Sequence, residues 1–349
     1  MPQYAILVQP SANRVYTQNA ARLVSNELLA LDDLLLGGRV AAGGGPVERR
    51  LGGVPYLVLD APDLTADDLR VLANLSSLFA LFELRADGSL LPVDAPRLDR
   101  YDDDLLTILK YIGKTNEQLT RLLLNLTAAA ALPVEGFLGS RVRVLDPMCG
   151  RGTTLNQALM YGWDAYGVDV DRRDVEAYTA FAARWLQDKR LKHRSRSSRV
   201  RVAGRNLGRR TTFELAATKE EFRAGDVQTL EITQGDTLDT AQMYRAGSFD
   251  VVVADAPYGI QHGSVTGPRT PSRSPHDLLA DAIPVWTTVL RRGGAMGLAW
   301  NTKVLPREDL VAMLRDAGLD PLEGPPFLGL AHRVDHAIER DVVVARKPR

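Results

Sequence analysis

The chain has 349 residues, of which 45% are hydrophobic and 25% charged, and 43 Lys and Arg balance 43 Asp and Glu. This composition argues against a disordered, fibrous or repeat-built protein, and the length predicts about two domains. No apolar run is long enough to cross a membrane, and the N-terminus lacks the pattern of an export signal. A single cysteine, Cys149, excludes an internal disulfide and a thiolate metal cluster, so we expect a cytoplasmic location.

The first 100 residues predict a small α/β domain. The segment 37–53 is rich in glycine and predicts a loop or hairpin, while 85–100 contains two prolines and predicts a linker. We therefore place a domain boundary near residue 100. Two strand-like runs are each followed by a helix-compatible stretch, and these four segments are 4–8, 19–31, 56–59 and 66–75.

Beyond residue 100 the sequence predicts two helices and then a regular alternation of strands and helices. The two helices are 102–109 and 116–131, with Thr115 or Asn116 as the N-cap of the second. This alternation favours βαβ units and a parallel sheet. Strands are predicted at 142–145, 165–168, 230–233, 249–254, 295–300 and 341–345, and helices at 154–161, 174–187, 278–290 and 307–317.

One segment interrupts this alternation and carries most of the local positive charge. Residues 193–221 are rich in Ser, Arg and Gly and predict a mobile or hairpin insertion. Between residues 184 and 210, eleven Lys or Arg stand against one acid, Asp188. Because phosphate neutralisation supplies most of the nonspecific affinity for nucleic acid, the segment 184–210 favours a nucleic-acid contact, with a solvated basic loop as the alternative.

A glycine-containing turn, DPMCGRGTT, begins at Asp146 directly after a predicted strand. Glycines there let the backbone approach a ligand at a helix N-terminus, although an ordinary tight turn has the same pattern. Asp169 ends the next strand, 23 residues after Asp146, where an acid accepts hydrogen bonds from ribose hydroxyls. Asp171 is the alternative residue for that role. No pyrophosphate or triphosphate cradle is present in the sequence, which favours an adenosyl ligand without phosphates.

A second motif, DAPYG, begins at Asp255 and follows another predicted strand. Ligands of open α/β sheets lie beyond the carboxyl ends of the strands, so Asp146, Asp169 and Asp255 would face one crevice. The Asp255 carboxylate and the Ala256 carbonyl would accept the two hydrogens of an exocyclic amine on a nucleobase. Tyr258 would stack on the extruded base. A proline turn with a capping aspartate is the alternative interpretation.

These motifs resemble those of the class I S-adenosylmethionine-dependent methyltransferases that act on amino groups. The block KYIGKTN at 110–116 is similar to a segment that precedes the catalytic motifs of tRNA guanine-N2 methyltransferases. The resemblance implies an α/β fold, Rossmann-like, with a seven-stranded, mostly parallel sheet and a smaller N-terminal α/β domain. It rests on four blocks in order, namely 146–154, 167–171, 235–236 and 255–259.

The resemblance also implies a domain division and a partner. Residues 1–100 would form a divergent THUMP-like RNA-binding domain, although nine basic against twelve acidic residues are not typical of one. Residues 101–349 would form the methyltransferase domain, with a basic insertion around 190–222. RNA, with tRNA modified at guanine N2 as the expected substrate, would bind through 184–210, with in-line transfer of the methyl group to the amine.

The resemblance assigns roles to individual residues. Asp169 would bind the ribose and Asp236 the adenine of S-adenosylmethionine. No metal is needed. The full set of cofactor-binding positions is Asp146, Pro147, Gly150, Gly152, Thr153, Asp169, Asp236 and Thr115, and the target base would be held by Asp255, Ala256, Pro257 and Tyr258.

One departure from the family pattern leaves other functions open. Ala256 replaces the first proline of the usual Asp-Pro-Pro-Tyr motif, so the loop loses rigidity. One alternative is a DNA adenine-N6 or cytosine-N4 methyltransferase, which uses a similar motif but would need a target-recognition domain that is not evident. Another is a catalytically silent RNA-binding module. A third is methylation of a protein glutamine amide, where Asn usually stands in place of Asp255.

Other features receive a structural interpretation. His332 and His336 have a spacing that suggests metal, but no further ligand lies between them, so we interpret both as surface or loop residues. Cys149 is interpreted as a small buried packing residue. Arg269 and Arg273 are expected to add contacts or a lid. The aromatic residues expected in the core are Trp163, Tyr166, Tyr178 and Trp185.

Overall fold

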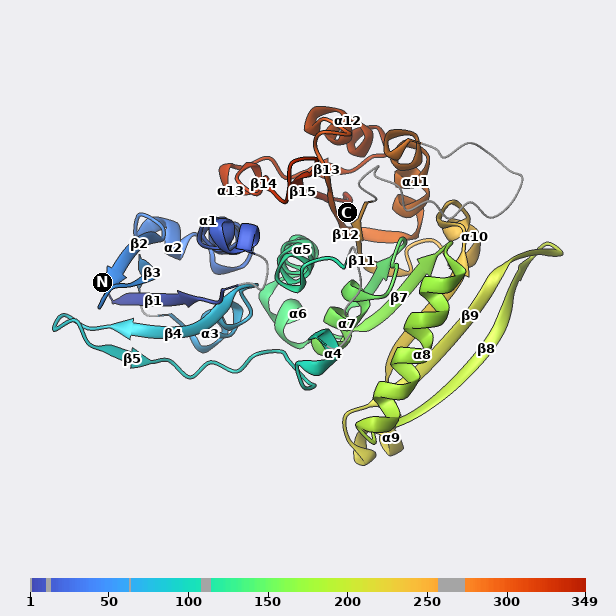
Figure 1. Ribbon diagram of the computed structural model, residues 1–349, viewed down its shortest axis with the longest axis horizontal. Helices are drawn as coiled ribbons and strands as arrows, with labels where there is room; N and C mark the ends of the chain where they lie inside the picture. Colours follow the sequence, from blue (N-terminus) through green and yellow to red (C-terminus); the bar gives the residue numbers. More distant parts are fainter. Residues whose placement is uncertain (1, 11–13, 63, 108–113, 257–273) are drawn as a thin grey trace.

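The computed structural model describes residues 2–10, 14–62, 64–107, 114–256 and 274–349. Figure 1 shows an N-terminal antiparallel sheet and a larger mixed sheet, with helix α5 (Glu117–Ala131) between them. No helix in the described part of the chain is both long and apolar enough to cross a membrane.

The N-terminal sheet contains five strands within the described residues, in the spatial order β2-β3-β1-β4-β5. These are β1 (Gln3–Val8), β2 (Val47–Leu51), β3 (Val54–Asp60), β4 (Leu78–Leu84) and β5 (Leu90–Pro92). The helical segments are α1 (Arg14–Leu31), η1 (Asp32–Leu36), α2 (Arg39–Ala42) and α3 (Ala66–Ala73). The two predicted strands and two predicted helices are therefore present. The predicted loop or hairpin at 37–53 contains α2 and β2, and β2 forms a hairpin with β3.

Two strands of this sheet were not predicted. β4 has the sequence LFALFEL, in which apolar residues occur on both faces, so it lacks the alternation that indicates a half-buried strand. β5 lies inside the predicted linker 85–100, so only part of that segment connects the two sheets. The division of the chain into two domains near residue 100 stays a prediction.

The larger sheet is built from elements that follow residue 100, and each strand and helix predicted there has a counterpart. Residues 108 and 109, at the end of one predicted helix, lie outside the described residues. The strands are β6 (Arg143–Asp146), β7 (Asp164–Asp169), β8 (Lys192–Val202), β9 (Arg205–Ala216), β10 (Gln228–Gly235), β11 (Phe249–Asp255), β12 (Leu290–Asn301), β13 (Asp320–Pro321), β14 (His332–Arg333) and β15 (Glu339–Arg346). The helical segments are α4 (Asp104–Thr107), α5, α6 (Val134–Gly139), α7 (Thr153–Met160), α8 (Arg172–Asp188), α9 (Lys219–Ala224), η2 (Thr237–Asp239), α10 (Thr240–Met243), α11 (Pro275–Val289), α12 (Arg307–Asp316) and α13 (Pro325–Leu328).

Five neighbouring strands, in the order β12-β11-β6-β7-β10, run parallel. β15 pairs antiparallel with β12 and carries β13 and β14, while β9 and β8 extend the opposite edge as antiparallel strands. The fold is a Rossmann-like α/β fold with a parallel centre. The expected seven strands are not what the described residues show, because they place ten strands in this sheet. The basic insertion adds β8 and β9, and the short strand β14 pairs with β15.

The parallel strands are buried on both faces. Val251 and Val253 of β11 pack in one cluster with residues of α5, α7 and α8, while Val252 and Ala254 pack in a second cluster with α11 and α12. All four side chains are completely buried, and each such valine contributes roughly 1.5–3 kcal/mol. A strand that is covered on both faces shows a run of apolar residues in its sequence. This explains why the predicted strand 249–254 differs from β11 by only one residue.

The residues interpreted as core are buried. Cys149 is 6% exposed, and burial raises the pKa of its thiol, which confirms a packing residue rather than a reactive thiolate. The four aromatic side chains expected in the core are buried as well, namely Trp163, Tyr166, Tyr178 and Trp185.

Helix α5 is fixed by a capping residue at its start and by a close approach to β12. Its N-cap is Asn116, whose side-chain oxygen accepts hydrogen bonds from the N–H groups of Gln118 and Leu119, so Asn116 is the cap of the two alternatives. The helix also approaches β12 closely, because a Cβ at Gly297 would lie 1.9 Å from the Thr127 hydroxyl oxygen. This packing holds Thr115, the residue before the cap, close to the end of β11.

Candidate active site

The carboxyl ends of the parallel strands place three acids at one edge of the larger sheet. The strand order reverses at β6, since β7 lies on one side of it and β11 on the other. In open α/β sheets a ligand crevice forms at such a switch point. Asp146, Asp169 and Asp255 are the last residues of β6, β7 and β11. The structure therefore brings together the three acids that the motifs singled out.

Asp146 lies at the centre of this group and is 3% exposed. Burial raises its pKa to about 7, and the charges of Asp169 and Asp255 act in the same direction. Hydrogen bonds from the Thr154 side chain and from the Met148 N–H, 3.1 Å from Oδ1, oppose the rise. Burial also raises the pKa of Asp169. A crevice in which carboxylates ionise reluctantly is one that a bound cation would stabilise.

Asp169 and Asp171, the two alternatives for the ribose ligand, make different contacts. Asp169 faces the glycine turn, where its Oδ2 accepts the N–H of Gly150 at 2.7 Å and its Oδ1 accepts that of Asp171 at 2.8 Å. The Asp171 side chain instead caps α8, accepting the N–H groups of Arg173 and Asp174. Asp169 is therefore the acid that faces the crevice.

The two glycines of the turn have different physical reasons to be glycine. Gly150 has φ +49°, and a Cβ there would meet no atom of the described residues within 4 Å, so they leave the space beside it open to a ligand. Gly152, the N-cap of α7, has φ +78°, and a Cβ there would lie 2.3 Å from the ring of Tyr178. Gly150 thus leaves room for a ligand, while Gly152 is required by packing beneath the turn.

The other predicted cofactor residues do not all lie at the glycine turn. Pro147 is buried in the turn, and Thr153, 9% exposed, begins α7. Asp236 follows β10, is exposed, and caps η2 by accepting the Leu238 N–H at 2.9 Å. Thr115 lies at the end of β11 instead, where its hydroxyl donates to Oδ2 of Asp255 at 2.5 Å. Its observed contact is with the second motif, not with the glycine turn.

Asp255 is held by groups from several elements. Its side chain is 16% exposed, and the guanidinium Nη2 of Arg340 lies 3.7 Å from the same Oδ2 that Thr115 contacts. Burial raises the pKa of Asp255, while Arg340, Thr115 and His332 lower it. Ala256 is 1% exposed, and its N–H donates to the Ala299 carbonyl at 2.8 Å. The backbone that carries this carboxylate is therefore anchored to β12.

Several predicted residues lie outside the described residues. These include the two remaining members of the second motif, part of the block 110–116, and the two arginines expected to form a lid. They are Pro257, Tyr258, Arg269, Arg273 and residues 110–113.

The sequence interpretation missed Arg340 and misplaced His332. His332 is 4% exposed rather than a surface or loop residue, because β14 pairs with β15 and the ring of Tyr16 packs edge-on against it at 5.7 Å. His336 is exposed, as expected. Arg340 could have been found from the strand order. The first residues of an antiparallel strand lie at the edge where parallel strands end, and three charged residues, 339–341, begin β15 ahead of its apolar run.

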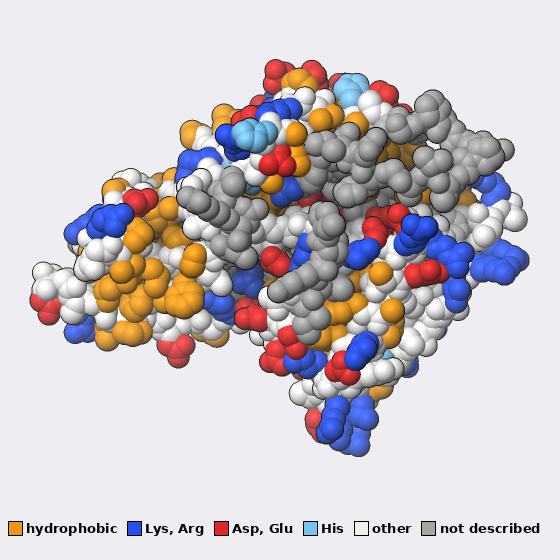
Figure 2. Space-filling view, viewed as in Figure 1, with side chains coloured by type: hydrophobic (Ala, Val, Ile, Leu, Met, Phe, Trp, Pro, Cys, Tyr) orange, Lys and Arg blue, Asp and Glu red, His pale blue; other side chains and the backbone are white. Residues whose placement is uncertain are grey.

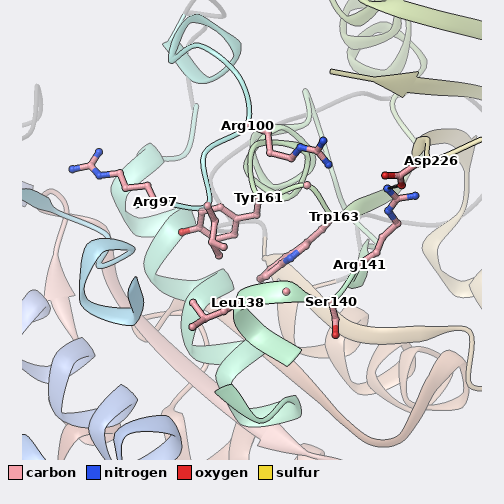
Figure 3. Close-up of a pocket in the computed structure, with 11 residues that line it drawn as sticks. Arg97, Arg100, Leu138, Ser140, Arg141, Tyr161, Trp163 and Asp226 are labelled. Atoms are coloured by element: carbon pink, nitrogen blue, oxygen red, sulfur yellow. Dashed lines mark hydrogen bonds and ion pairs between the residues drawn. The ribbon is translucent and has the colours of Figure 1, made fainter. Parts of the chain in front are cut away.

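A cavity of about 530 Å³ lies at the opposite edge of the sheet (Figure 3). Its lining includes Arg141, Trp163 and Asp226, which precede β6, β7 and β10. Two of its arginines form ion pairs, Arg141 with Asp226 and Arg100 with Glu221. Because the three acids lie at the carboxyl ends of these strands, this cavity is separate from the candidate site.

The basic insertion is a long hairpin that reaches past the site edge (Figure 1). Gly208 of β9 pairs with Gly235, the last residue of β10, so the turn at Gly204 extends about 13 Å beyond the carboxyl edge of the sheet. Arg199 lies directly opposite Arg209. Figure 2 shows Lys and Arg side chains along this edge of the molecule. Within 184–210, the exposed basic residues that form no ion pair with another described residue are Arg190, Lys192, Arg196, Arg199, Arg201, Arg205 and Arg209.

Comparison with known families decides the type of domain. Residues 116–269 match the model of the RMKL-like methyltransferase domain. This segment is a methyltransferase domain. The methyltransferase domain contains all three acids and the basic hairpin, while Thr115 immediately precedes it and Arg340 lies beyond it.

Solved structures of methyltransferases are similar to this chain at low sequence identity. No curated protein matches the chain. One similar structure is the magnesium protoporphyrin IX methyltransferase of Synechocystis, which is 13% identical, with 70% of this chain and 90% of that one covered and a TM-score of 0.39. Another is the 1,6-didemethyltoxoflavin-N1-methyltransferase of Burkholderia thailandensis, 15% identical, with coverages of 65% and 79% and a TM-score of 0.36. Both TM-scores are below 0.5, so the assignment rests on the family model.

Proposed function

We propose that this protein transfers a methyl group from S-adenosylmethionine to an exocyclic amine of a nucleobase, with guanine N2 in tRNA as the acceptor. The observation that carries the proposal is the position of Asp255, at the end of the strand next to β6 in a methyltransferase domain. It places a hydrogen-bond acceptor for an amine beside the crevice that the glycine turn opens.

The residues around the crevice fit the cofactor. S-adenosylmethionine, when bound, supplies an electrophilic methyl group on a positively charged sulfonium. Asp146 is buried and Asp169 is half-buried, and desolvation raises the pKa of both carboxyl groups, so a cation beside them would relieve an electrostatic cost. Gly150 leaves open space at the turn, and the first N–H groups of α7 suit a carboxylate. Asp169 would accept hydrogen bonds from ribose hydroxyls, and Asp236 would face the adenine.

Asp255 and Ala256 account for the choice of an amine. The lone pair of an exocyclic amine is delocalised into the base, so the amine is a poor nucleophile until its hydrogens are held by acceptors. The carboxylate of Asp255 and the backbone carbonyl of Ala256 would accept these two hydrogens and stabilise the positive charge that develops on nitrogen. The proton is then lost to Asp255 or to water. The anchoring of the Ala256 N–H to Ala299 gives this loop a fixed start despite the missing proline.

The basic hairpin supports a nucleic-acid substrate. Like charges opposite one another across two strands are destabilising, and Arg199 and Arg209 form such a pair. A polyanion that binds the outer part of the hairpin would remove this repulsion. The register places that part beyond the same edge of the sheet as Asp255. A strand of RNA held there would pass the crevice, with its backbone on the arginines and a base directed inward.

A transfer assay with labelled methyl donor tests the proposal. Purified protein is incubated with S-adenosylmethionine and, separately, with bulk tRNA, ribosomal RNA, duplex DNA and a protein extract, as wild type, Asp255→Ala and Asp316→Ala. Asp316 is exposed on α12 and serves as the matched control. We expect label in tRNA with wild type and with the Asp316 variant, and loss of label with the Asp255 variant.

The other outcomes identify the alternatives. Label in DNA alone would assign a DNA amino-methyltransferase, and label in protein alone would assign an amide methyltransferase. Cofactor binding in calorimetry without transfer to any substrate would indicate a silent RNA-binding module. Each of these results contradicts the proposed acceptor.

A further inference from the structure

We propose that Arg340 is a positioning residue for Asp255, which it holds oriented and ionised from the neighbouring antiparallel strand. This inference rests on the proposed function, in which Asp255 accepts the amine hydrogen. Arg340 lies outside the segment that matches the family model, and its assignment comes from the geometry around the carboxylate.

The strand order brings Arg340 to the site. β15 runs antiparallel to β12, so its first residues lie where β11 and β12 end. Asp255 pairs with Ala299 of β12, and Arg340 pairs with Asn301, two residues further along the same strand. Across β12, the Arg340 Nη2 reaches to 3.7 Å from the Asp255 Oδ2, with the Arg340 side chain only 7% exposed. A buried pair at this distance is poorly screened by solvent.

Arg340 and Thr115 act on the same oxygen from different elements. The Thr115 hydroxyl donates to Oδ2 at 2.5 Å from the start of α5, and the guanidinium of Arg340 approaches it from β15. Two groups converging on one oxygen fix the rotation of the carboxylate. Thr115 contributes a neutral hydrogen bond, whereas Arg340 contributes a permanent positive charge.

Two titratable neighbours of Arg340, Asp341 on β15 and His332 on β14, are respectively ion-paired and neutral. The adjacent acid, Asp341, forms an ion pair with Arg307 of α12, with 2.5 Å between Oδ2 and Nη1. His332, opposite Arg340 on β14, is buried, and burial lowers its pKa, so it is neutral near pH 7. The titratable groups facing Asp255 are then Asp146 from β6, His332 from β14 and Arg340 from β15. Arg340 is the cation among these described groups near neutral pH.

The N-terminal helix α1 contacts the segment 329–332, which pairs with the strand that carries Arg340. The Arg22 Nη2 donates to the Ala331 carbonyl at 2.6 Å, and the Asn26 side chain donates to the Gly329 carbonyl at 2.8 Å. The ring of Tyr16 packs against His332. These contacts fix the segment that leads into β14, and β14 pairs with β15 at Arg340. Arg340 therefore lies on a strand that is hydrogen-bonded to β14, and the segment before β14 is hydrogen-bonded to α1.

The charge of Arg340 has a consequence for pH dependence. Burial raises the pKa of Asp255, and the charge of Arg340 is the largest influence that lowers it. An arginine beside an aspartate typically lowers the pKa of that aspartate by about 1–3 units, so removing Arg340 should raise the pKa of Asp255 by that amount. The ionised carboxylate of Asp255 is a stronger hydrogen-bond acceptor than the protonated form, and only the ionised form can take up the amine proton. The acid limb of activity should therefore move to higher pH.

The test compares Arg340→Met, Arg340→Lys and Arg346→Met. Arg346 lies at the far end of β15, and its side chain contacts the Ala130 carbonyl, so it is a matched control on the same strand. The carboxyl carbon of Asp255, assigned with Asp255→Asn, is titrated by ¹³C NMR in the protein without cofactor. The pH profile of kcat, the cofactor affinity and the melting temperature are measured for each variant.

In Arg340→Met we expect the Asp255 titration and the acid limb of kcat to move up together by about 1–3 pH units, with cofactor affinity unchanged. Arg340→Lys keeps the positive charge, so its Asp255 titration should lie close to that of wild type. Arg346→Met should leave the Asp255 titration unchanged. An unmoved Asp255 titration in Arg340→Met, or a loss of kcat that is equal at every pH, would overturn the proposal.

Two further outcomes are kept apart from these. If wild type methylates no nucleic acid, the proposed function fails, but the NMR titration still decides whether Arg340 controls the ionisation of Asp255. If Arg340→Met does not fold, Arg340→Gln keeps part of the stem and two N–H donors and removes the charge. A titration of Asp255 that is unmoved in Arg340→Gln would overturn the proposal in the same way.

Discussion

Replacing each glycine of the turn with alanine separates packing from ligand binding. In Gly152→Ala the new Cβ would lie 2.3 Å from the Tyr178 ring, a contact that real Cβ atoms do not make. The ring cannot retreat easily, because Tyr178 is completely buried and its hydroxyl donates to the Asn156 side chain at 2.7 Å. Overpacking of this kind costs about 1–3 kcal/mol, and a non-glycine residue in a left-handed conformation adds about 1–2 kcal/mol.

The expected loss of unfolding free energy for Gly152→Ala is therefore about 2–5 kcal/mol. Gly150→Ala has the same kind of backbone strain at φ +49° but meets no atom, so it should lose only about 1–2 kcal/mol. Urea unfolding measures both variants. Calorimetry with S-adenosylmethionine should show a larger loss of affinity for folded Gly150→Ala than for folded Gly152→Ala. The alanine methyl group at position 150 enters the space that is open to the ligand. Equal stability losses in the two variants would refute this reasoning.

Three further changes have expected outcomes. Thr115→Val removes a neutral hydrogen bond to Asp255 and should lower kcat about tenfold with unchanged cofactor affinity, and a reduced affinity in calorimetry would instead place Thr115 at the cofactor. Replacing Arg199 and Arg209 together with Gln should reduce the slope of log K against log salt for tRNA by about 1.4, measured by fluorescence anisotropy, and an unchanged slope would exclude them from the interface. Asp146→Asn should flatten the pH dependence of stability. The folded protein holds a proton on Asp146 up to about pH 7, whereas the unfolded chain releases it near its ordinary pKa of 3.8, so this group makes the wild type less stable as pH rises through that window. The difference between wild type and variant should reach about 4 kcal/mol in denaturant melts across that range, and parallel curves would contradict it.

The centre of the larger sheet could be predicted from the sequence because its strands are buried on both faces. β11 contains the apolar run 251–254, which the charged Asp255 follows. The apolar run indicates that the strand is buried, and the charged residue marks where the strand ends. The meeting of Asp146, Asp169 and Asp255 followed from the rule that parallel strands end at one edge. These inferences need only local patterns and one rule of topology.

The contacts that could not be predicted join residues that are distant in sequence. His332 is buried because β14 pairs with β15 and Tyr16 packs on it, and nothing within its own segment indicates either contact. Thr115 contacts Asp255 across 140 positions of sequence. β8 and β9 were predicted only as a mobile or hairpin insertion, because charged and polar residues on both faces obscure the strand alternation.

The most direct measurement is the identity of the modified nucleoside. tRNA labelled by the protein and S-adenosylmethionine is digested to nucleosides, which are separated and identified by mass spectrometry, for wild type and Asp255→Ala. We expect N2-methylguanosine with wild type and none with the variant. Label on a ring nitrogen, a carbon or a ribose, or N2-methylguanosine that persists in Asp255→Ala, would contradict the role of Asp255 as acceptor for an exocyclic amine.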